Sequence, residues 1–354
     1  MTLASSDTAE PQAPPRGTGR LSGRLSGRLL GLVIAVAVLA IAVFLSLALG
    51  ARQVDLGSVI GAIFDPQSGD TNQMVIRDLR VPRTIIGLVA GAALALAGAV
   101  VQGLTRNPLA DPGLLGVNAG ASLFVVLGIT FFGVSSAFGQ VWFAFAGAAA
   151  ATVVVYLVSS GRSGPTPVAL TLAGSAVTAA LTSIITLVLL GNLDTLNQFR
   201  FWAVGSLVGR SLDSLAVFGP FVLVGAVLAL SLGRTLNVLS LGEDVARGLG
   251  GHVGRARVLA SVAVVLLCGS ATALAGPIVF VGLVVPHIAR RFVGADYRWV
   301  LAYSLVLGPT LLVLADVVGR LVLAPAELEA GLVVAFIGAP VMIALVRSKR
   351  LGVL

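Results

Sequence analysis

Few residues of this 354-residue sequence have side chains and spacing that could support catalysis. The two histidines, His252 and His287, form no His-x-x-x-His pair, so no zinc site is predicted. Lys349 is followed by Arg350 instead of serine or threonine, so the sequence lacks a nucleotide-binding P-loop. The single cysteine, Cys268, lies in an apolar run and has no disulfide partner. We therefore expect no catalytic residues and no metal or cofactor bound by this chain.

One carboxylate does lie inside an apolar segment. Asp316 is followed one helical turn later by Arg320. An ionisable residue in a membrane segment is a functional candidate by default, and a proton-coupled carrier would use it as a relay. The structural alternative is an internal Asp316–Arg320 helix pair, in which the arginine holds the acid ionised. An ion-coupled secondary transporter that uses Asp316 is the alternative function.

The composition shows what must position these residues. The chain is 57% hydrophobic and 11% charged, with a mean hydropathy of +1.03. Soluble domains carry about 25% charged residues, so this chain cannot cover its apolar content without a bilayer. We predict an all-α polytopic membrane protein of about ten transmembrane helices, and a further half-buried helix at 199–208. The expected spans are 29–50, 84–104, 114–132, 140–160, 167–190, 215–233, 258–275, 277–289, 300–323 and 331–346.

The charges predict an orientation for these spans. Most of the 23 Lys and Arg residues lie in the gaps that share a side with both termini, which the positive-inside rule places in the cytoplasm. That rule explains the net charge of +8 without a nucleic-acid partner. Residues 1–28 are expected to be a disordered Arg-rich cytoplasmic tail. Residues 29–346 form the transmembrane domain, and 347–354 form a short basic cytoplasmic terminus.

Several arginines fall on the external side, against the rule. Arg80 and Arg83 flank Pro82 at the outer mouth of the second span, and Arg320 is near the outer end of the ninth. Guanidinium groups suit carboxylates, so these residues predict an acidic partner or substrate. Snorkelling is the structural alternative.

Two polar segments interrupt the apolar pattern. In 102–116, Pro108 and Pro112 stop the second span, and the preceding Asn107 and Asp111 are suited to bond the freed backbone groups. An elaborate turn is the plain interpretation.

The second segment, 234–257, is the longest internal polar gap. Ser240 and Glu243 have the spacing of a capping box, and Gly250 with Gly251 would end the helix that follows. A short helix that docks on a partner and a solvated connector are both compatible with this pattern.

A stripe of small residues gives the second span one close-packing face. It recurs at every fourth position, which predicts a tight helix–helix interface. The stripe consists of Gly87, Gly91, Ala95, Ala99 and Gly103.

Together these motifs resemble the FecCD family, the permease subunits of ATP-binding-cassette (ABC) importers for iron-siderophores and cobalamin. The likeness covers nearly all of 29–346. It rests on Leu79–Thr84, Gln102 with Asn107–Gly116, Leu241–Gly250, Gly276–His287, Leu314–Asp316 and Glu327. Glu327-Leu-Glu329 departs from it, since relatives often have proline in place of Glu329.

The resemblance implies the partners and the cargo. We expect ten helices per subunit, pairing with a second copy or a paralogous permease, and cytoplasmic ATPase subunits that hold ATP and Mg. An extracytoplasmic substrate-binding protein would deliver a metal chelate, foremost an iron(III)-siderophore, with haem and cobalamin also compatible. The location implied is the cytoplasmic membrane of a prokaryote.

The resemblance also implies roles for residues. Arg80, Arg83 and Arg320 would meet glutamates of the binding protein, with Asp316 orienting Arg320. The residues that couple to the ATPase would be Leu241, Gly242, Glu243, Ala246, Leu249 and Gly250. The structural or pathway motifs would contribute Gln102, Asn107, Pro108, Asp111, Pro112, Asn118, Pro286, His287 and Asp316.

Overall fold

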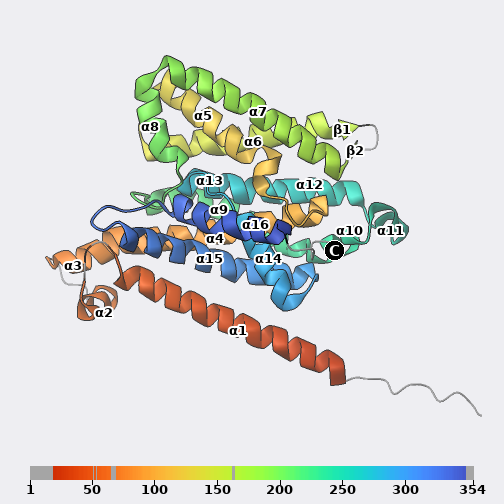
Figure 1. The fold of residues 1–354 in the computed structure, drawn as a ribbon, viewed down its shortest axis with the longest axis horizontal. Coiled ribbons are helices and arrows are strands. Elements are labelled where there is room, and N and C mark those ends of the chain that lie inside the picture. The colour runs from red at the N-terminus through yellow and green to blue at the C-terminus, as the bar shows by residue number, and fades with distance from the viewer. Residues whose placement is uncertain (1–18, 51, 53, 65–68, 162–163, 348–354) are drawn as a thin grey trace, which may run out of the picture.

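A computed structural model describes residues 19–50, 52, 54–64, 69–161 and 164–347. It is built of long helices with short connections (Figure 1). The helices are α1 (Gly19–Ala48), α2 (Leu56–Phe64), α3 (Thr71–Met74), α4 (Val81–Thr105), α5 (Val117–Phe132), α6 (Ala137–Ser159), α7 (Pro167–Gly191), α8 (Leu193–Ala203), α9 (Leu212–Ser231), α10 (Gly233–Ser240), α11 (Glu243–Gly248), α12 (Val253–Val264), α13 (Ser270–Ala275), α14 (Val281–Val293), α15 (Tyr297–Val322) and α16 (Ala330–Arg347).

Short irregular elements join some of these helices. π-Helical turns at Val75–Arg80 and Val265–Gly269 connect α3 to α4 and α12 to α13, and a 3₁₀ turn, Pro112–Leu115, precedes α5. The two-residue strands β1 (Ser160–Gly161) and β2 (Gly164–Pro165) pair antiparallel, with Ser160 opposite Pro165. The predicted all-α class is therefore confirmed, with one minimal strand pair added.

The predicted spans correspond to the long helices. Among the described residues, seven helical stretches are long and apolar enough to cross a membrane, and Val117–Phe132 and Ala330–Ala344 are shorter apolar helices. The remaining predicted segment, 277–289, becomes α14, which has 13 residues because the chain is not helical from Gly276 to Phe280. The expected helix at 199–208 is present as α8, shifted toward the N-terminus.

Helix α4 is the centre of the bundle. It packs on α15, α14, α9, α12 and α13, while α5, α6, α7 and α8 form a neighbouring layer. The small-residue stripe makes the close packing possible: a Cβ on Gly91 would lie 2.6 Å from the carbonyl oxygen of Gly308 in α15. A Cβ on Gly103 would lie 2.9 Å from Leu236 and 3.0 Å from Tyr297. The predicted tight interface is confirmed.

Two local predictions are wrong. Residues 19–28, expected to belong to a disordered tail, continue α1, and Arg28 Nη2 donates to the Val293 carbonyl at 2.9 Å. The capping box is not formed, because Ser240 closes α10 and its hydroxyl donates to the Asn237 carbonyl, leaving Gly242 to precede α11. Residues 1–18 and 348–354, the rest of the predicted terminal segments, lie outside the described residues.

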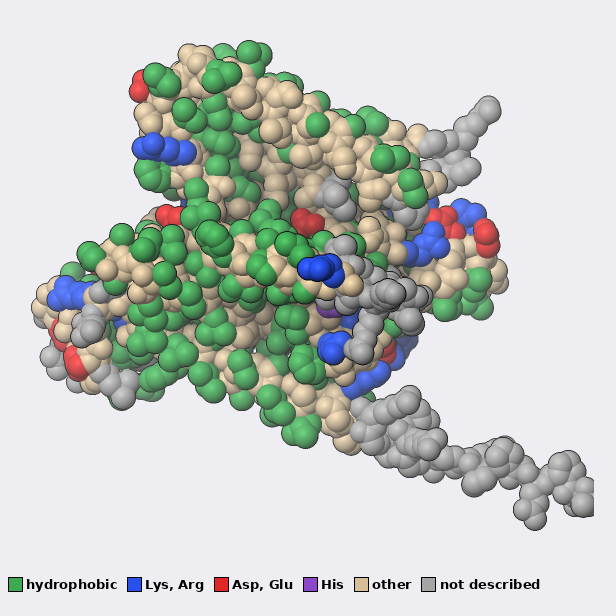
Figure 2. All heavy atoms as spheres, viewed as in Figure 1, with side chains coloured by type: hydrophobic (Ala, Val, Ile, Leu, Met, Phe, Trp, Pro, Cys, Tyr) green, Lys and Arg blue, Asp and Glu red, His purple; other side chains and the backbone are tan. Residues whose placement is uncertain are grey.

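The bundle has two polar ends with an apolar middle. We call the end that carries α2, α3 and α8 the α8 end, and the end that carries α10 and α11 the α11 end (Figure 1). Figure 2 shows hydrophobic side chains over the faces between the ends, with blue and red side chains gathered toward the ends. This distribution fits a protein whose middle is solvated by lipid.

Candidate functional site

At the α8 end, two arginines cap the C-terminus of α1. Arg80 Nη1 donates to the carbonyls of Leu47 and Ala48 at 2.7 and 2.9 Å. Arg320 Nη1 donates to the carbonyls of Ser46 and Leu49 at 2.9 and 3.1 Å. The last carbonyls of a helix have no partner within that helix and carry its negative dipole end. Both guanidinium groups therefore stabilise the C-terminal end of α1.

The third arginine belongs to a buried ion cluster. Arg83 Nε donates to both Asp316 oxygens at 2.9 Å, and its Nη1 donates to Glu327 Oε2 at 2.6 Å. Arg320 Nη2 donates to Asp316 Oδ2 at 2.7 Å. Asp316 is 1% exposed and accepts from two guanidinium groups, so it pairs with Arg320 as the structural alternative predicted.

These contacts change what the three arginines offer to a partner. Arg80, Arg83 and Arg320 are 5%, 9% and 2% exposed, not free at the surface. They line a pocket of about 390 Å³ together with Asp78 and Glu327 and two further arginines, Arg52 and Arg210. The pocket is therefore rich in positive charge. Their contact with a binding protein stays a prediction, with these arginines in the pocket wall.

At the α11 end, α11 is anchored to the next helix by an ion pair. Glu243 Oε1 accepts from Arg257 on α12, whose side chain is buried, while Arg247 lies 3.5 Å from Glu243 Oε2. Gly242 has φ +107°, a conformation that L side chains rarely adopt, and turns the chain from α10 into α11. Ala246 is buried, and the NH of Gly251 closes the turn on its carbonyl at 2.8 Å.

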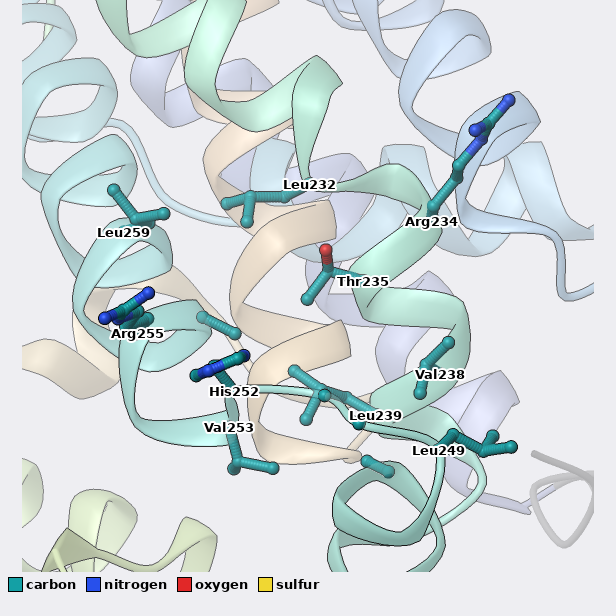
Figure 3. A pocket seen from close by; sticks show the side chains of 14 residues that line it. Leu232, Arg234, Thr235, Val238, Leu239, Leu249, His252, Val253, Arg255 and Leu259 are labelled. Atoms are coloured by element: carbon teal, nitrogen blue, oxygen red, sulfur yellow. The ribbon is translucent and has the colours of Figure 1, made fainter.

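The other coupling candidates present apolar side chains to solvent. Leu241 and Leu249 are 62% and 67% exposed, with Val245 at 49%. Behind them lies a pocket of about 400 Å³ between α10, α11 and α12 (Figure 3). Leu232, Val238, Leu239 and Leu259 supply apolar walls, His252 and Arg255 lie at the start of α12, and Arg234 extends away from the hollow. Exposed apolar side chains around a hollow mark an interaction surface.

Segment 102–116 is an ordered turn, as predicted. Asn107 Oδ1 accepts from the Leu109 amide at 3.0 Å, and Asp111 Oδ1 accepts from the Gly113 amide at 2.8 Å. Pro108 follows Asn107 in the turn, and Pro112 begins the 3₁₀ turn after Asp111. Asn118, in the first turn of α5, accepts from the Thr272 hydroxyl at 3.2 Å and so ties the turn to α13.

The turn also meets the break before α14. A Cβ on Gly282 would lie 2.8 Å from Pro112 Cδ, and Phe280 adopts φ +69° just before the helix begins. Pro286 is buried within α14 and His287 is half-buried beside it. Non-helical backbone at membrane depth is tolerated where it is buried in protein or lines a cavity. The pathway role of these residues stays a prediction.

Sequence reasoning missed a polar network at the α11 end. Arg290 Nη1 donates to Gln102 Oε1 at 2.6 Å, and Asn237 Nδ2 donates to Asp296 Oδ1 at 2.7 Å. The hydrogen bond from Arg298 helps lower the pKa of Asp296 to about 2. A weak signal did exist: Arg290 and Arg291 are adjacent in an amphipathic helix, so at most one of the pair could face water fully.

The comparisons with known proteins agree with this architecture. The model of the FecCD transport family matches residues 38–348. The ferric enterobactin permease FepD of Escherichia coli is 50% identical over 89% of this chain and 94% of its own length. The iron(3+)-citrate permease YfmD of Bacillus subtilis is 40% identical over 89% and 94%. A metal-chelate type ABC transporter solved in an inward-facing conformation has a TM-score of 0.79 at 30% identity, over 89% of this chain and 98% of its own.

The described helices form an apolar bundle with two polar ends. The chain belongs to the FecCD transport family, as its motifs predicted, and it is a multi-pass permease of the ABC-importer class.

Proposed function

We propose that this permease carries an iron(III)-siderophore across the cytoplasmic membrane of a prokaryote. A substrate-binding protein delivers the chelate at the α8 end, and ATPase subunits at the α11 end hold ATP and Mg and drive transport. Both termini then lie in the cytoplasm, as the distribution of basic residues predicts.

The exposed apolar surface formed by Leu241, Val245 and Leu249 at the α11 end is the observation that carries the proposal. A solvated connector has no reason to expose Leu241, Val245 and Leu249 together, next to a pocket that Leu249 helps to line. Such a surface stabilises a complex when a partner covers it, because apolar area is removed from water. An ATPase bound there explains why this chain needs no P-loop of its own.

The pocket at the α8 end supports docking of an acidic partner. Five arginines and two acids line it. Carboxylates of a binding protein entering this pocket would bond to guanidinium nitrogens that the internal contacts leave available. Arg77, exposed nearby on the turn before α4, extends the positive surface.

One face of α7 supports a second permease copy or a paralogous permease. In the most apolar stretch of α7, 17% of residues are buried, and its exposed side carries a row of hydroxyls. These include Ser175, Thr182 and Thr186, each bonded back to a carbonyl of its own helix. Each hydroxyl donates within its own helix and keeps acceptor lone pairs that water or a partner subunit can use, so we assign this exposed face to the contact with the partner subunit.

The cargo is inferred from the relatives. Their names specify ferric enterobactin, iron(3+)-hydroxamate, iron(3+)-citrate and hemin. Three of these four are iron(III) chelates of small molecules, and the one with 50% identity takes a siderophore. An iron(III)-siderophore is therefore the best-supported substrate class.

The test is uptake by a deletion strain. Loss of the permease should abolish accumulation of ⁵⁵Fe from at least one siderophore in a panel of ferric chelates, with haem and cobalamin in parallel. The plasmid-borne gene should restore it. Normal uptake of every siderophore together with loss of haem or cobalamin uptake would reassign the cargo.

An ion-coupled carrier using Asp316 is disfavoured by the contacts of that residue. Both carboxylate oxygens already accept from arginines, and a relay must exchange protons with water. Reconstituted alone with an ion gradient, the permease should accumulate nothing. An adjacent reading frame that encodes a P-loop ATPase would support the importer.

A further inference from the structure

The α11 end contains a continuous chain of hydrogen bonds that links the exposed loop to the helices of the bundle. It starts at Asn237 on α10. The Asn237 amide nitrogen donates to Asp296 Oδ1 at 2.7 Å, and its oxygen accepts from the Tyr297 backbone amide at 2.7 Å. Asp296 is the N-cap of α15. One carboxamide thus joins α10 to the first turn of α15.

Tyr297 carries the chain from α15 to α14. Its ring is 1% exposed and packs against the end of α4, where the position of a Cβ on Gly103 lies 3.0 Å from the ring. Arg290 of α14 donates from Nη2 to the Tyr297 hydroxyl at 3.2 Å, and its guanidinium lies 5.4 Å from the ring centroid.

Gln102 completes the chain at the beginning of α14. Its oxygen accepts from Arg290 at 2.6 Å, and its nitrogen donates to the carbonyls of Gly282 and Leu283 at 3.2 and 3.3 Å. Gln102 is 0% exposed. Bonds from α10 therefore reach the point where α14 starts, next to the non-helical segment that ends at Phe280.

We propose that Asn237 is a positioning residue for transport: it locks α10 to the start of α15, so that the beginning of α14 follows the loop held by the ATPase. This inference rests on the proposed function, because it takes the ATPase as the partner of α11. Separating α10 from α15 would leave the Tyr297 amide and the Asp296 carboxylate without Asn237, a costly state for partly buried groups. The loop and the two helix starts therefore move together.

The loop is held at both of its ends. On the other side, Glu243 pairs with Arg257, which fixes α11 to α12. A movement of α11 is thus transmitted to α12 through the Glu243–Arg257 ion pair, and to α15 and α14 through Asn237. Losing the Asn237 contact leaves α11 attached to α12 and α10 packed on α4 through Leu236, while it removes the hydrogen-bonded route to α14.

The decisive experiment exchanges the two partners of the first link. Asn237→Asp places a carboxylate against Asp296, whereas Asn237→Asp with Asp296→Asn restores a donor, two acceptors and the net charge. Asp194→Asn is the matched control, since that side chain is exposed on α8, at the end opposite the loop. The readout is maleimide labelling of Val279→Cys, 40% exposed just before α14, in a Cys268→Ala background. Labelling is compared in the co-purified permease–ATPase complex without nucleotide and after trapping with ATP and vanadate.

We expect trapping to change the labelling rate about tenfold in the reference protein, which corresponds to about 1.4 kcal/mol. Asn237→Asp should bring the ratio of the two labelling rates close to one while ATP hydrolysis continues. The exchanged pair should restore the tenfold ratio. Asp194→Asn should leave the ratio unchanged.

Three results would overturn the proposal. The first is a reference protein whose labelling rate does not change on trapping. The second is an Asn237→Asp protein that shows the full change in labelling rate. The third is an exchanged pair that hydrolyses ATP but does not recover the change. If the Asn237→Asp protein is not produced in the membrane, the same labelling experiment on Gln102→Met tests the proposal, because that change removes the last link with little change in shape. Failure of the wild-type permease to retain any ATPase would instead refute the proposed function.

Discussion

The buried arginines that line the pocket at the α8 end contrast with two exposed arginines that line the pocket at the α11 end. At the α8 end, Arg80, Arg83 and Arg320 are buried and bonded to helix carbonyls and carboxylates of the same chain. At the α11 end, Arg234 and Arg255 are exposed and line the pocket together with the exposed Leu249. The three buried arginines of the α8 end are bonded within the chain, whereas the α11 end exposes apolar side chains that a partner can cover.

Substitutions at these two groups of residues should therefore affect different properties, stability at the α8 end and partner binding at the α11 end. Removing a charge at the α8 end should unfold part of the bundle, because a buried charge without its partner is costly. Removing an exposed side chain at the α11 end should weaken a complex and leave the fold intact. An exchange of Arg80 and Arg83 to glutamate therefore tests packing as well as docking.

The largest effect is expected for Asp316→Leu. It leaves Arg83 and Arg320 buried without their shared carboxylate, and removing one partner of a buried ion pair costs about 3–5 kcal/mol. The amount of monodisperse protein in detergent and its unfolding temperature should both fall sharply. Asp244→Leu, at a fully exposed carboxylate, is the control and should match wild type. A stable Asp316→Leu protein that loses gradient-driven uptake would revive the relay.

A smaller loss is expected for Arg80→Met. The methionine fills part of the space but cannot donate to Leu47, Ala48 and the Arg52 carbonyl, which Arg80 Nη2 reaches at 2.6 Å. Hydrogen bonds from a charged donor are worth about 1.5–3 kcal/mol, so the end of α1 should fray. Hydrogen exchange of 44–50 measures this directly. Arg77→Met, at an exposed neighbour, should leave the hydrogen exchange of 44–50 unchanged. Intact exchange protection with lost binding-protein affinity would make docking the main role of Arg80.

The sequence was sufficient for the parts of the fold that depend on local pattern. Apolar run length located the spans, the small-residue stripe predicted that α4 packs closely on a neighbouring helix, and Pro112 with Asp111 predicted an ordered turn. The break at Gly276–Phe280 shortened one span because a proline and two positive-φ residues, Gly276 and Phe280, override apolar character there.

The site was less predictable because its geometry depends on distant partners. Arg80 and Arg320 were expected to be external charges, but their acceptors are backbone carbonyls at the end of α1. Every residue has a backbone carbonyl, so the sequence does not show which ones will accept these bonds. Asn237 and Tyr297 are sixty positions apart, so their contact required the fold. The spacing of Ser240 and Glu243 matched a capping box, yet α10 used Ser240 as its last residue.

At the α11 end, Leu249→Ser should leave stability unchanged and reduce retention of the ATPase. Fewer than about 30% of interface residues cost more than about 1 kcal/mol when truncated, and we expect Leu249, exposed at the pocket, to be one of them, with a several-fold loss of affinity. Co-purification from detergent at increasing dilution measures the loss. Leu193→Ser is the matched control, since Leu193 is 70% exposed at the opposite end and Leu249 is 67% exposed. Equal retention by both variants would mean that the loop is a solvated connector.

The smallest effect is a pH dependence confined to the α11 end. The pKa of Asp296 is lowered to about 2, chiefly by the hydrogen bond from Arg298, against an ordinary value of 3.8. Because the folded pKa is depressed, its contribution to stability is present above about pH 4 and disappears as the pH falls through 2. The difference in unfolding temperature between wild type and Asp296→Asn should therefore shrink across that window and stay constant above it. The same series on Asp244→Asn should track wild type, because solvent screens that exposed charge. A difference that begins to shrink above pH 5 would mean that another group holds the start of α15, and the α11 end would then owe its shape to contacts other than Asp296.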